Sequence, residues 1–150
     1  MSRAVLCSIA FVAIVGCVPA FAVDGVVLIN QASITAAGGF PFSIIQPGSY
    51  KLSGNLVVPA EADGIHIIGA GVTLDLNGFS ISGPIVCDFS GQHCSPNSTQ
   101  GTTGIFYSGV GTAIRNGRVN GFAMGIQGFQ GSGVVEDIQA TSNSRFGIIT

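Results

Sequence analysis

A two-residue step, glycine followed by isoleucine, recurs along this chain and constrains its fold more than any other feature. It occurs as Gly104-Ile105, Gly125-Ile126 and Gly147-Ile148, at intervals of 21 and 22 residues. A fourth copy, Gly64-Ile65, lies 40 residues before the first of these, close to two intervals. A fixed period in this range is typical of stacked supersecondary units, each of which contacts only its neighbours. The sequence therefore predicts a repeat fold rather than a closed globule.

The composition fits many short strands joined by tight turns. The 150 residues leave room for one domain, and 47% of them are hydrophobic, 8% are charged and 23 are glycine. Val and Ile favour strands, whereas Gly, Ser and Asn favour turns. The hydrophobic content argues against a disordered chain. The net charge of −2, without any cluster of Lys or Arg, argues against nucleic acid as a partner, because phosphate binding needs concentrated positive charge.

The first 22 residues have the pattern of a signal peptide. Arg3 supplies a short basic region, residues 4–18 are apolar, and residues 20–22 (Ala-Phe-Ala) form a small-x-small cleavage site. The apolar run is short for a membrane span, and no second span follows it. We therefore expect a secreted or periplasmic protein. An alternative stays open, because residues 14–17 resemble a bacterial lipobox, which would place a lipid anchor on Cys17 of an outer-membrane or surface lipoprotein.

The mature chain, residues 23–150, opens with an expected cap. Residues 25–29 form an apolar run that predicts a strand, and residues 30–37 predict a short helix or turn. A stack of coils exposes an unpaired apolar end that terminal elements usually cover. We expect these two elements to cover the N-terminal end of the stack.

Strict alternation between residues 64 and 81 separates an inward face from an outward face. Aliphatic residues occupy the positions on either side of His66 and Asp75. A period of two places these aliphatic side chains inward and both polar side chains outward. Since the sequence offers His66 no evident partner, we expect it to be a lone surface residue.

Residues 84–101 interrupt the period. The 40-residue interval exceeds one period by 18 or 19 residues, about the length of this segment, so we predict a loop inserted between two coils. It contains Cys87 and Cys94, and an even pair of cysteines in an exported protein predicts a disulfide, stabilising by about 2 kcal/mol. A zinc site with Asp88 and His93 is the alternative, disfavoured because adjacent His and Cys lack the usual ligand spacing.

Charged residues at outward positions are the candidates for chemistry. We align Leu76, Ile114 and Val135 as equivalent positions of three coils. The residues that follow them then form one outward column of Asn77, Arg115 and Glu136. Stacked strands lie about 4.8 Å apart, so Arg115 and Glu136 could pair. The plainer alternative is a surface ion pair that contributes about 0 to 1 kcal/mol.

Several of these features resemble the right-handed parallel β-helix proteins of the pectate-lyase-like superfamily. They are the 21- to 22-residue period, the Gly-Ile strand starts, the aliphatic triplets and the Asn-Gly corners. Residues 46–58 (QPGSYKLSGNLVV) and 72–83 (VTLDLNGFSISG) resemble the N-terminal part of exported bacterial β-helix repeat proteins. The resemblance covers residues 25–150 and implies an all-β, single-stranded solenoid. The crossover rule also predicts right-handed winding.

The resemblance implies less about function, because this scaffold carries many activities. It implies outward sites of carboxylates and Arg or Lys, sometimes with Ca²⁺, and the matching candidates are Asp75, Arg115 and Glu136. The adjacent pair Glu136-Asp137 fits a turn better than a Ca²⁺ site, which needs six or more oxygens. No catalytic motif is evident, so an enzyme, if present, would resemble a polysaccharide lyase or hydrolase.

We therefore expect an exported β-helix protein that binds polysaccharide or cell-surface glycan, or that forms the N-terminal part of a carbohydrate-active enzyme. The alternative is a non-catalytic structural or adhesive surface protein. Residues 145–150 would begin a new coil, and no cap follows them in the sequence. We therefore expect the β-helix to be incomplete at its C-terminus.

Overall fold

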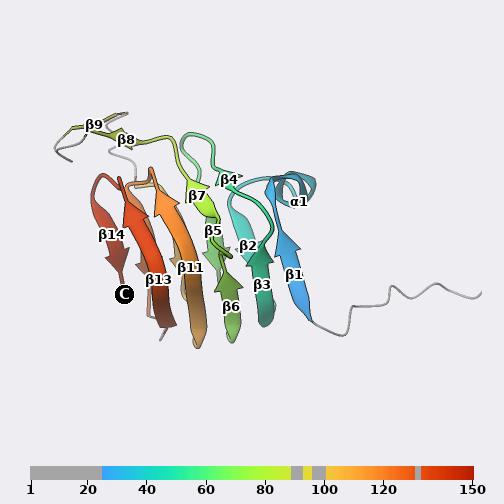
Figure 1. The fold of residues 1–150 in the computed structure, drawn as a ribbon. Helices are drawn as coiled ribbons and strands as arrows, with labels where there is room; N and C mark the ends of the chain where they lie inside the picture. Colours follow the sequence, from blue (N-terminus) through green and yellow to red (C-terminus); the bar gives the residue numbers. More distant parts are fainter. Residues whose placement is uncertain (1–24, 89–92, 96–100, 131–132) are drawn as a thin grey trace, which may run out of the picture.

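The computed structural model describes residues 25–88, 93–95, 101–130 and 133–150. They form an all-β parallel solenoid of about five turns, in which successive coils stack along one axis (Figure 1). The predicted β-helix architecture is thereby confirmed, and its right-handed winding stays a prediction. The signal peptide and Cys17 fall outside the described residues. Within those residues, no helix is both long and apolar enough to cross a membrane.

One face of the solenoid is a five-stranded parallel sheet in the order β14-β12-β10-β5-β2. Its strands are β2 (Phe42–Ile44), β5 (Ile65–Ile67), β10 (Thr103–Tyr107), β12 (Met124–Gly128) and β14 (Phe146–Ile149). Ile105 pairs with both Ile65 and Ile126, and Ile126 also pairs with Ile148. The four Gly-Ile steps therefore stack in register, as the period predicts. The Gly-Ile step does not mark the first strand of the first coil, β2, because Phe42 stands in the place of Ile where β2 pairs with β5.

The glycine of the step is required by the closeness of the coils. A Cβ atom added at Gly64 would meet the carbonyl oxygen of Gly104, and one at Gly104 would lie 2.7 Å from the carbonyl oxygen of Gly125. The same collision recurs between Gly125 and Gly147. The isoleucine that follows each glycine points into the core, fully buried in the three coils from β5 to β12. The step therefore combines close backbone stacking with an internal aliphatic column.

The remaining faces belong to a second parallel sheet, which bends at a corner. Its strands are β1 (Val26–Ile29), β3 (Gly48–Leu52), β4 (Leu56–Val57), β6 (Val72–Asp75), β7 (Ser80–Ser82), β11 (Thr112–Asn120) and β13 (Gly133–Thr141). The strands β11 and β13 pass through the corner without a break, whereas β6 and β7 are separate strands that both pair with β11. Each complete coil therefore presents three strand segments around one core.

The predicted alignment at this corner is wrong by two residues. Ile114 pairs with Leu74, and not with Leu76, while Val119 pairs with Ile81 as predicted. The coil that contains β6 has two more residues between these positions than the coil of β11. The chain accommodates them in a turn at Asn77-Gly78, where both residues have positive φ. Leu76 is still buried, which explains why the alternation did not reveal the extra pair.

The N-terminal cap is present as β1 and a short helix, α1 (Gln31–Ala36). Asn30 and Ser33 form a capping box at the start of the helix, and the side chain of Ile34, on the helix, is fully buried in the core. The side-chain amide of Gln31 accepts a hydrogen bond from the Val57 amide at 2.9 Å and donates one to the Val57 carbonyl at 3.2 Å. The helix therefore satisfies backbone groups of β4 that would otherwise form an exposed edge.

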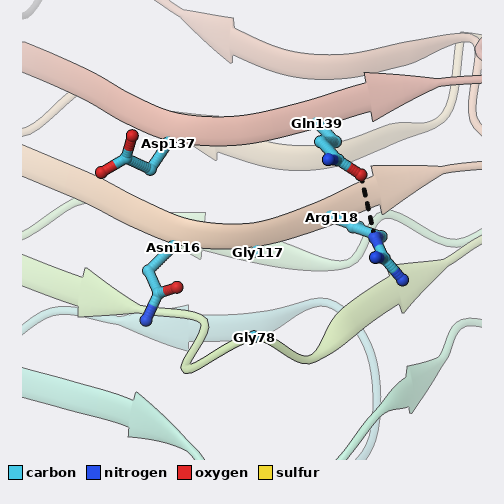
Figure 2. A pocket seen from close by; sticks show the side chains of 6 residues that line it. All are labelled: Gly78, Asn116, Gly117, Arg118, Asp137 and Gln139. Atoms are coloured by element: carbon cyan, nitrogen blue, oxygen red, sulfur yellow. Dashed lines mark hydrogen bonds between the residues drawn. The ribbon is translucent and has the colours of Figure 1, made fainter.

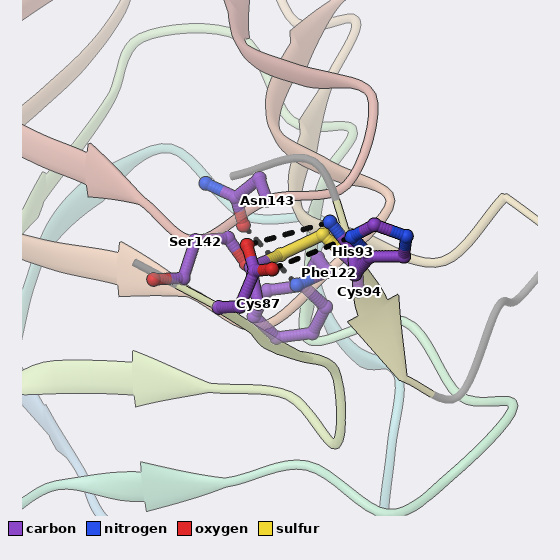
Figure 3. The surroundings of a disulfide bond; sticks show 7 residues. Cys87, His93, Cys94, Phe122, Ser142 and Asn143 are labelled. Atoms are coloured by element: carbon purple, nitrogen blue, oxygen red, sulfur yellow. Dashed lines mark hydrogen bonds and ion pairs between the residues drawn. A yellow bond between two sulfur atoms is a disulfide. The ribbon is translucent and has the colours of Figure 1, made fainter. Parts of the chain in front are cut away.

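The insertion between β7 and β10 begins as a short antiparallel hairpin of β8 (Val86–Cys87) and β9 (Cys94–Ser95). The predicted disulfide joins Cys87 to Cys94 across this hairpin (Figure 3). The Cys87 sulfur lies 3.5 Å from the carbonyl oxygen of Ser142, at the end of β13. Because a disulfide sulfur carries no hydrogen, this is a packing contact. It places the hairpin against the last coils of the stack.

Candidate functional site

The structure brings Asp75, Arg115 and Glu136 into one outward column. Arg115 is in register with Asp75 on one side and with Glu136 on the other, and Lys51 is in register with Asp75. Asn77 does not belong to this column, because the two-residue expansion displaces it into the turn. The corrected column therefore alternates in charge along the stack, in the order Lys51, Asp75, Arg115, Glu136.

The carboxylate of Asp75 accepts hydrogen bonds mainly from the bend of the second sheet beside it. Its Oδ1 accepts a hydrogen bond from the Asn77 amide at 2.7 Å and another from Asn116 Nδ2 at 3.1 Å. Its Oδ2 lies 3.9 Å from Arg115 Nε, and the Arg115 side chain is 48% exposed. A long, exposed pair of this kind contributes little stability. Asp75 thus holds the turn in place, and the long ion pair of Arg115 is made with Asp75 rather than with Glu136, the partner that the sequence suggested.

We name Asn77, Asn116 and Asp137 the asparagine corner, since they occupy the bend of the second sheet in three successive coils. Their φ angles are 54°, 63° and 51°. Asn and Asp tolerate this left-handed conformation better than other residues with a side chain. The expectation that Glu136-Asp137 fits a turn agrees with the position of Asp137. The left-handed residue also interrupts the strict alternation, so that polar side chains on both sides of the corner face solvent.

A polar hollow of about 180 Å³ opens at the asparagine corner. It is lined by Gly78, Asn116, Gly117, Arg118, Asp137 and Gln139. Figure 2 shows Asn116 and Asp137 on one side of it and Arg118 and Gln139 on the other. Arg118 Nε donates a hydrogen bond to Gln139 Oε1 at 2.9 Å, which leaves the terminal guanidinium nitrogens as further donors. The hollow thus offers donors on one side and a carboxylate and an amide on the other.

Sequence reasoning considered Asp137 only as part of a turn and missed the hollow that it lines. Gln139 carries no charge, and its contact with Arg118 joins residues 21 positions apart. The one available signal was the near-period spacing of Arg118 and Gln139, which places both at the same position of successive coils. The alignment of Ile114 with Val135 already placed the two side by side, but it missed the two-residue expansion that contains Gly78, which also lines the hollow.

His66 has partners, which corrects the expectation of a lone histidine. Its Nε2 lies 2.9 Å from Asp63 Oδ2, and its ring meets Phe106 edge-on at 5.4 Å between centroids. Asp63 Oδ1 also accepts a hydrogen bond from the Thr103 amide at 2.7 Å. Thr103 begins β10, where the chain rejoins the stack after the insertion. Asp63 therefore joins the returning chain to the preceding coil, and His66 contacts the other oxygen of the same carboxylate.

A metal site is not supported by the described geometry. Cys87 and Cys94 are joined to each other, so neither is available as a thiolate ligand, and the zinc alternative fails. His93 instead lies 3.4 Å from Asp88 on the same hairpin. Within residues 25–88, 93–95, 101–130 and 133–150, no group of three or more His, Cys, Asp or Glu side chains is placed to hold an ion.

Comparison with protein-family models, with curated proteins and with solved structures finds no match for this chain. The class of protein is therefore defined by the observed strand pairing alone: it is a parallel β-solenoid of the β-helix kind.

Proposed function

We propose that this chain is an exported β-helix protein that binds polysaccharide in the hollow at the asparagine corner. The observation that carries the proposal is the juxtaposition of Arg118, Gln139, Asn116 and Asp137 around one open cavity. Sugar hydroxyls both donate and accept hydrogen bonds, and these four side chains supply both kinds of partner. Because the hollow is open and small, it suits one residue of a chain that continues along the surface.

The proposal favours a glycan that carries acidic groups. The terminal nitrogens of Arg118 are suited to a carboxylate or sulfate, since guanidinium groups recognise planar oxygen pairs. Asp137, on the other side, would repel an anion and accept from a neutral hydroxyl. A sugar whose acidic group faces Arg118 and whose hydroxyls face Asp137 satisfies both conditions.

Membership of the pectate-lyase-like superfamily belongs to this proposal too. It is supported by the stacked parallel strands, the in-register Gly-Ile steps and the left-handed Asn residues at the corner. We propose binding rather than catalysis, because the best placed carboxylate, Asp75, is occupied by backbone and Asn116 donors. The exported character is supported by the signal-peptide pattern and by the Cys87–Cys94 disulfide.

The test is a binding titration of the folded, exported protein against neutral and acidic polysaccharides, with and without Ca²⁺, followed by calorimetry. We expect binding to an acidic glycan that weakens at least tenfold in Arg118→Ala. Arg145→Ala is the matched control, because it removes an exposed arginine that does not line the hollow. If no glycan binds, or if both variants lose affinity equally, the structural or adhesive alternative replaces the proposal. Release of unsaturated or reducing ends would show catalysis as well.

A further inference from the structure

The hairpin of β8 and β9, which we name the disulfide hairpin, lies across the ends of two later coils. Just before it, the Ile85 amide donates to the carbonyl of Gly121, after β11, at 2.9 Å. Two residues further on, the Cys87 sulfur lies 3.5 Å from the carbonyl oxygen of Ser142, after β13. Figure 3 shows the disulfide bond beside Ser142. This segment therefore joins the coil of β7 to the ends of both β11 and β13.

Ser142 has a backbone conformation that serine rarely adopts. Its φ is 53°, in the left-handed region that favours glycine, asparagine and aspartate. A residue of another type stays there only when its surroundings hold it. The carbonyl oxygen of Ser142 accepts a hydrogen bond from the Gly121 amide at 3.2 Å and also contacts the Cys87 sulfur. Two contacts from different elements thus meet at one atom, directly after the last residue of β13.

The strand β13 is weakly held by the rest of the stack. None of its nine residues is buried. Among the described residues, it pairs along one side only, with β11. Segments with few buried apolar contacts are the first to open in a native protein. Since β13 supplies Asp137 and Gln139 to the hollow, and Gln139 lies only three residues before Ser142, a loss of order at Ser142 affects the hollow.

The disulfide bond is the main link between the two described strands of the hairpin. β8 and β9 pair at two positions, and the disulfide joins one of these pairs. An isolated two-stranded hairpin is marginally stable at best in water. Val86 is 71% exposed, so it adds little apolar burial. Both cysteines are partly exposed, so a reductant can reach them while the core stays folded.

We propose that the Cys87–Cys94 disulfide is a redox-sensitive switch that holds the end of β13, and that reduction by a dithiol releases it. A thiolate of the dithiol attacks one sulfur of the bond, and the other cysteine leaves as a thiolate. The second thiol of the reductant then displaces the first cysteine and closes a disulfide within the reductant. The dithiol thus supplies two electrons, and its two protons pass to Cys87 and Cys94.

Reduction separates the two strands of the hairpin, so that the Cys87 sulfur no longer lies against Ser142. Ser142 then relaxes to a negative φ, and the last pairs of β13 with β11 open. Gln139 loses its fixed position beside Arg118, to which it is hydrogen-bonded at 2.9 Å. The oxidised protein therefore has an ordered hollow, and the reduced protein has a loosened one. The consequence for glycan affinity rests on the proposed function, whereas the consequence for β13 does not.

The test is hydrogen exchange, measured by mass spectrometry on the folded, exported protein before and after reduction with dithiothreitol. We expect the amides of residues 133–142 to exchange at least tenfold faster after reduction. Those of β3, residues 48–52, should stay unchanged, because β3 lies between β1 and β6, away from the hairpin. Cys87→Ser combined with Cys94→Ser is the control. It should exchange like the reduced protein and should not respond to dithiothreitol.

Titration with an acidic glycan, on the oxidised and the reduced protein, separates the switch from the glycan proposal. We expect the affinity to fall at least fivefold on reduction. Unchanged exchange in β13, or an equal rise in β3, overturns the switch whether or not a glycan binds. Faster exchange in β13 with unchanged affinity overturns the link to the hollow. If β13 responds but no glycan binds the oxidised protein, the proposed function fails and the switch stands.

Discussion

Two corners of the same coils adopt left-handed backbone conformations with different residues. One is the asparagine corner; the other, the glycine corner, comprises residues 45–48, 68–71 and 108–111, which join the five-stranded sheet to the second sheet. At each corner, at least three coils contain a residue with positive φ. The glycine corner uses Gly48, Gly71 and Gly111, and the asparagine corner uses Asn77, Asn116 and Asp137. These glycines supply the left-handed conformation without a side chain, and beside them Gly69 and Gly109 allow the coils to approach closely, because a Cβ at either would meet a backbone carbonyl oxygen. Asn and Asp keep a polar side chain, so their corner carries hydrogen-bonding groups and a hollow. The two corners thus share a left-handed backbone but present different side chains, polar at the asparagine corner and none at the left-handed positions of the glycine corner.

The largest effect on this comparison is expected from Gly109→Ala. The added Cβ would meet the carbonyl oxygens of Gly69 and Ile68, so the coils must move apart. We expect a loss of about 1 to 3 kcal/mol in the free energy of unfolding, measured by urea denaturation. Gly54→Ala is the control, because a Cβ there has no atom within 4 Å, and its effect should stay within about 0.5 kcal/mol. Equal effects would show that close stacking does not define the glycine corner.

Asn116→Val should have the next largest effect, at the other corner. Asn116 has a φ of 63°, and a β-branched residue in this left-handed region costs about 1 to 2 kcal/mol. Asn116→Gly keeps the backbone conformation and loses one exposed hydrogen bond to Asp75, so we expect it to lie close to wild type. Thermal unfolding of the two variants makes the comparison. A valine variant as stable as the glycine variant would contradict the role assigned to backbone conformation.

Arg115→Ala should have the smallest effect. Its pair with Asp75 is long and exposed, so the free energy of unfolding should change by no more than about 0.5 kcal/mol. Asp75→Ala is the informative partner, because it also removes the two hydrogen bonds that hold the corner. We expect chemical denaturation to show a greater loss for Asp75→Ala. If Arg115→Ala were as destabilising as Asp75→Ala, the ion pair rather than the corner would be the important contact.

The stacking of the coils could be predicted from the sequence because it depends on a local rule repeated at a fixed period. A glycine at the close approach and an isoleucine in the core mark four strands of one sheet, and the disulfide was predicted from an even pair of cysteines after a signal-peptide pattern. The first strand of the first coil, β2, was missed because Phe42 stands where the other coils have the isoleucine of the step. The register at Leu76 was wrong because the two extra residues at the corner preserve the alternation of buried side chains on both sides.

The candidate site was harder to predict, since its contacts join different coils and irregular segments. Asp75, Arg115 and Glu136 were correctly grouped as outward residues, yet their column depended on the corrected register. Asp63 lies in a connecting segment before β5, where no periodicity indicates that it meets His66. The hollow needs Arg118 and Gln139 side by side, which the alignment of β11 with β13 allowed, and Gly78, whose turn the alignment missed.

The register across the insertion is the central claim, and engineered cysteines test it most directly. Thr73 and Ala113 are paired neighbours on the outward face, 40 residues apart in sequence. Paired positions of adjacent strands lie about 4.8 Å apart, within the Cα range of a disulfide, whereas positions offset by two residues lie beyond about 7 Å. Thr73→Cys with Ala113→Cys should therefore form a disulfide under mild oxidation, identified by peptide mass spectrometry. Asp75→Cys with Ala113→Cys, the pair that sequence alignment alone would bring together, should not. Efficient linkage of 75 to 113 with none between 73 and 113 would contradict the stacking described for this protein.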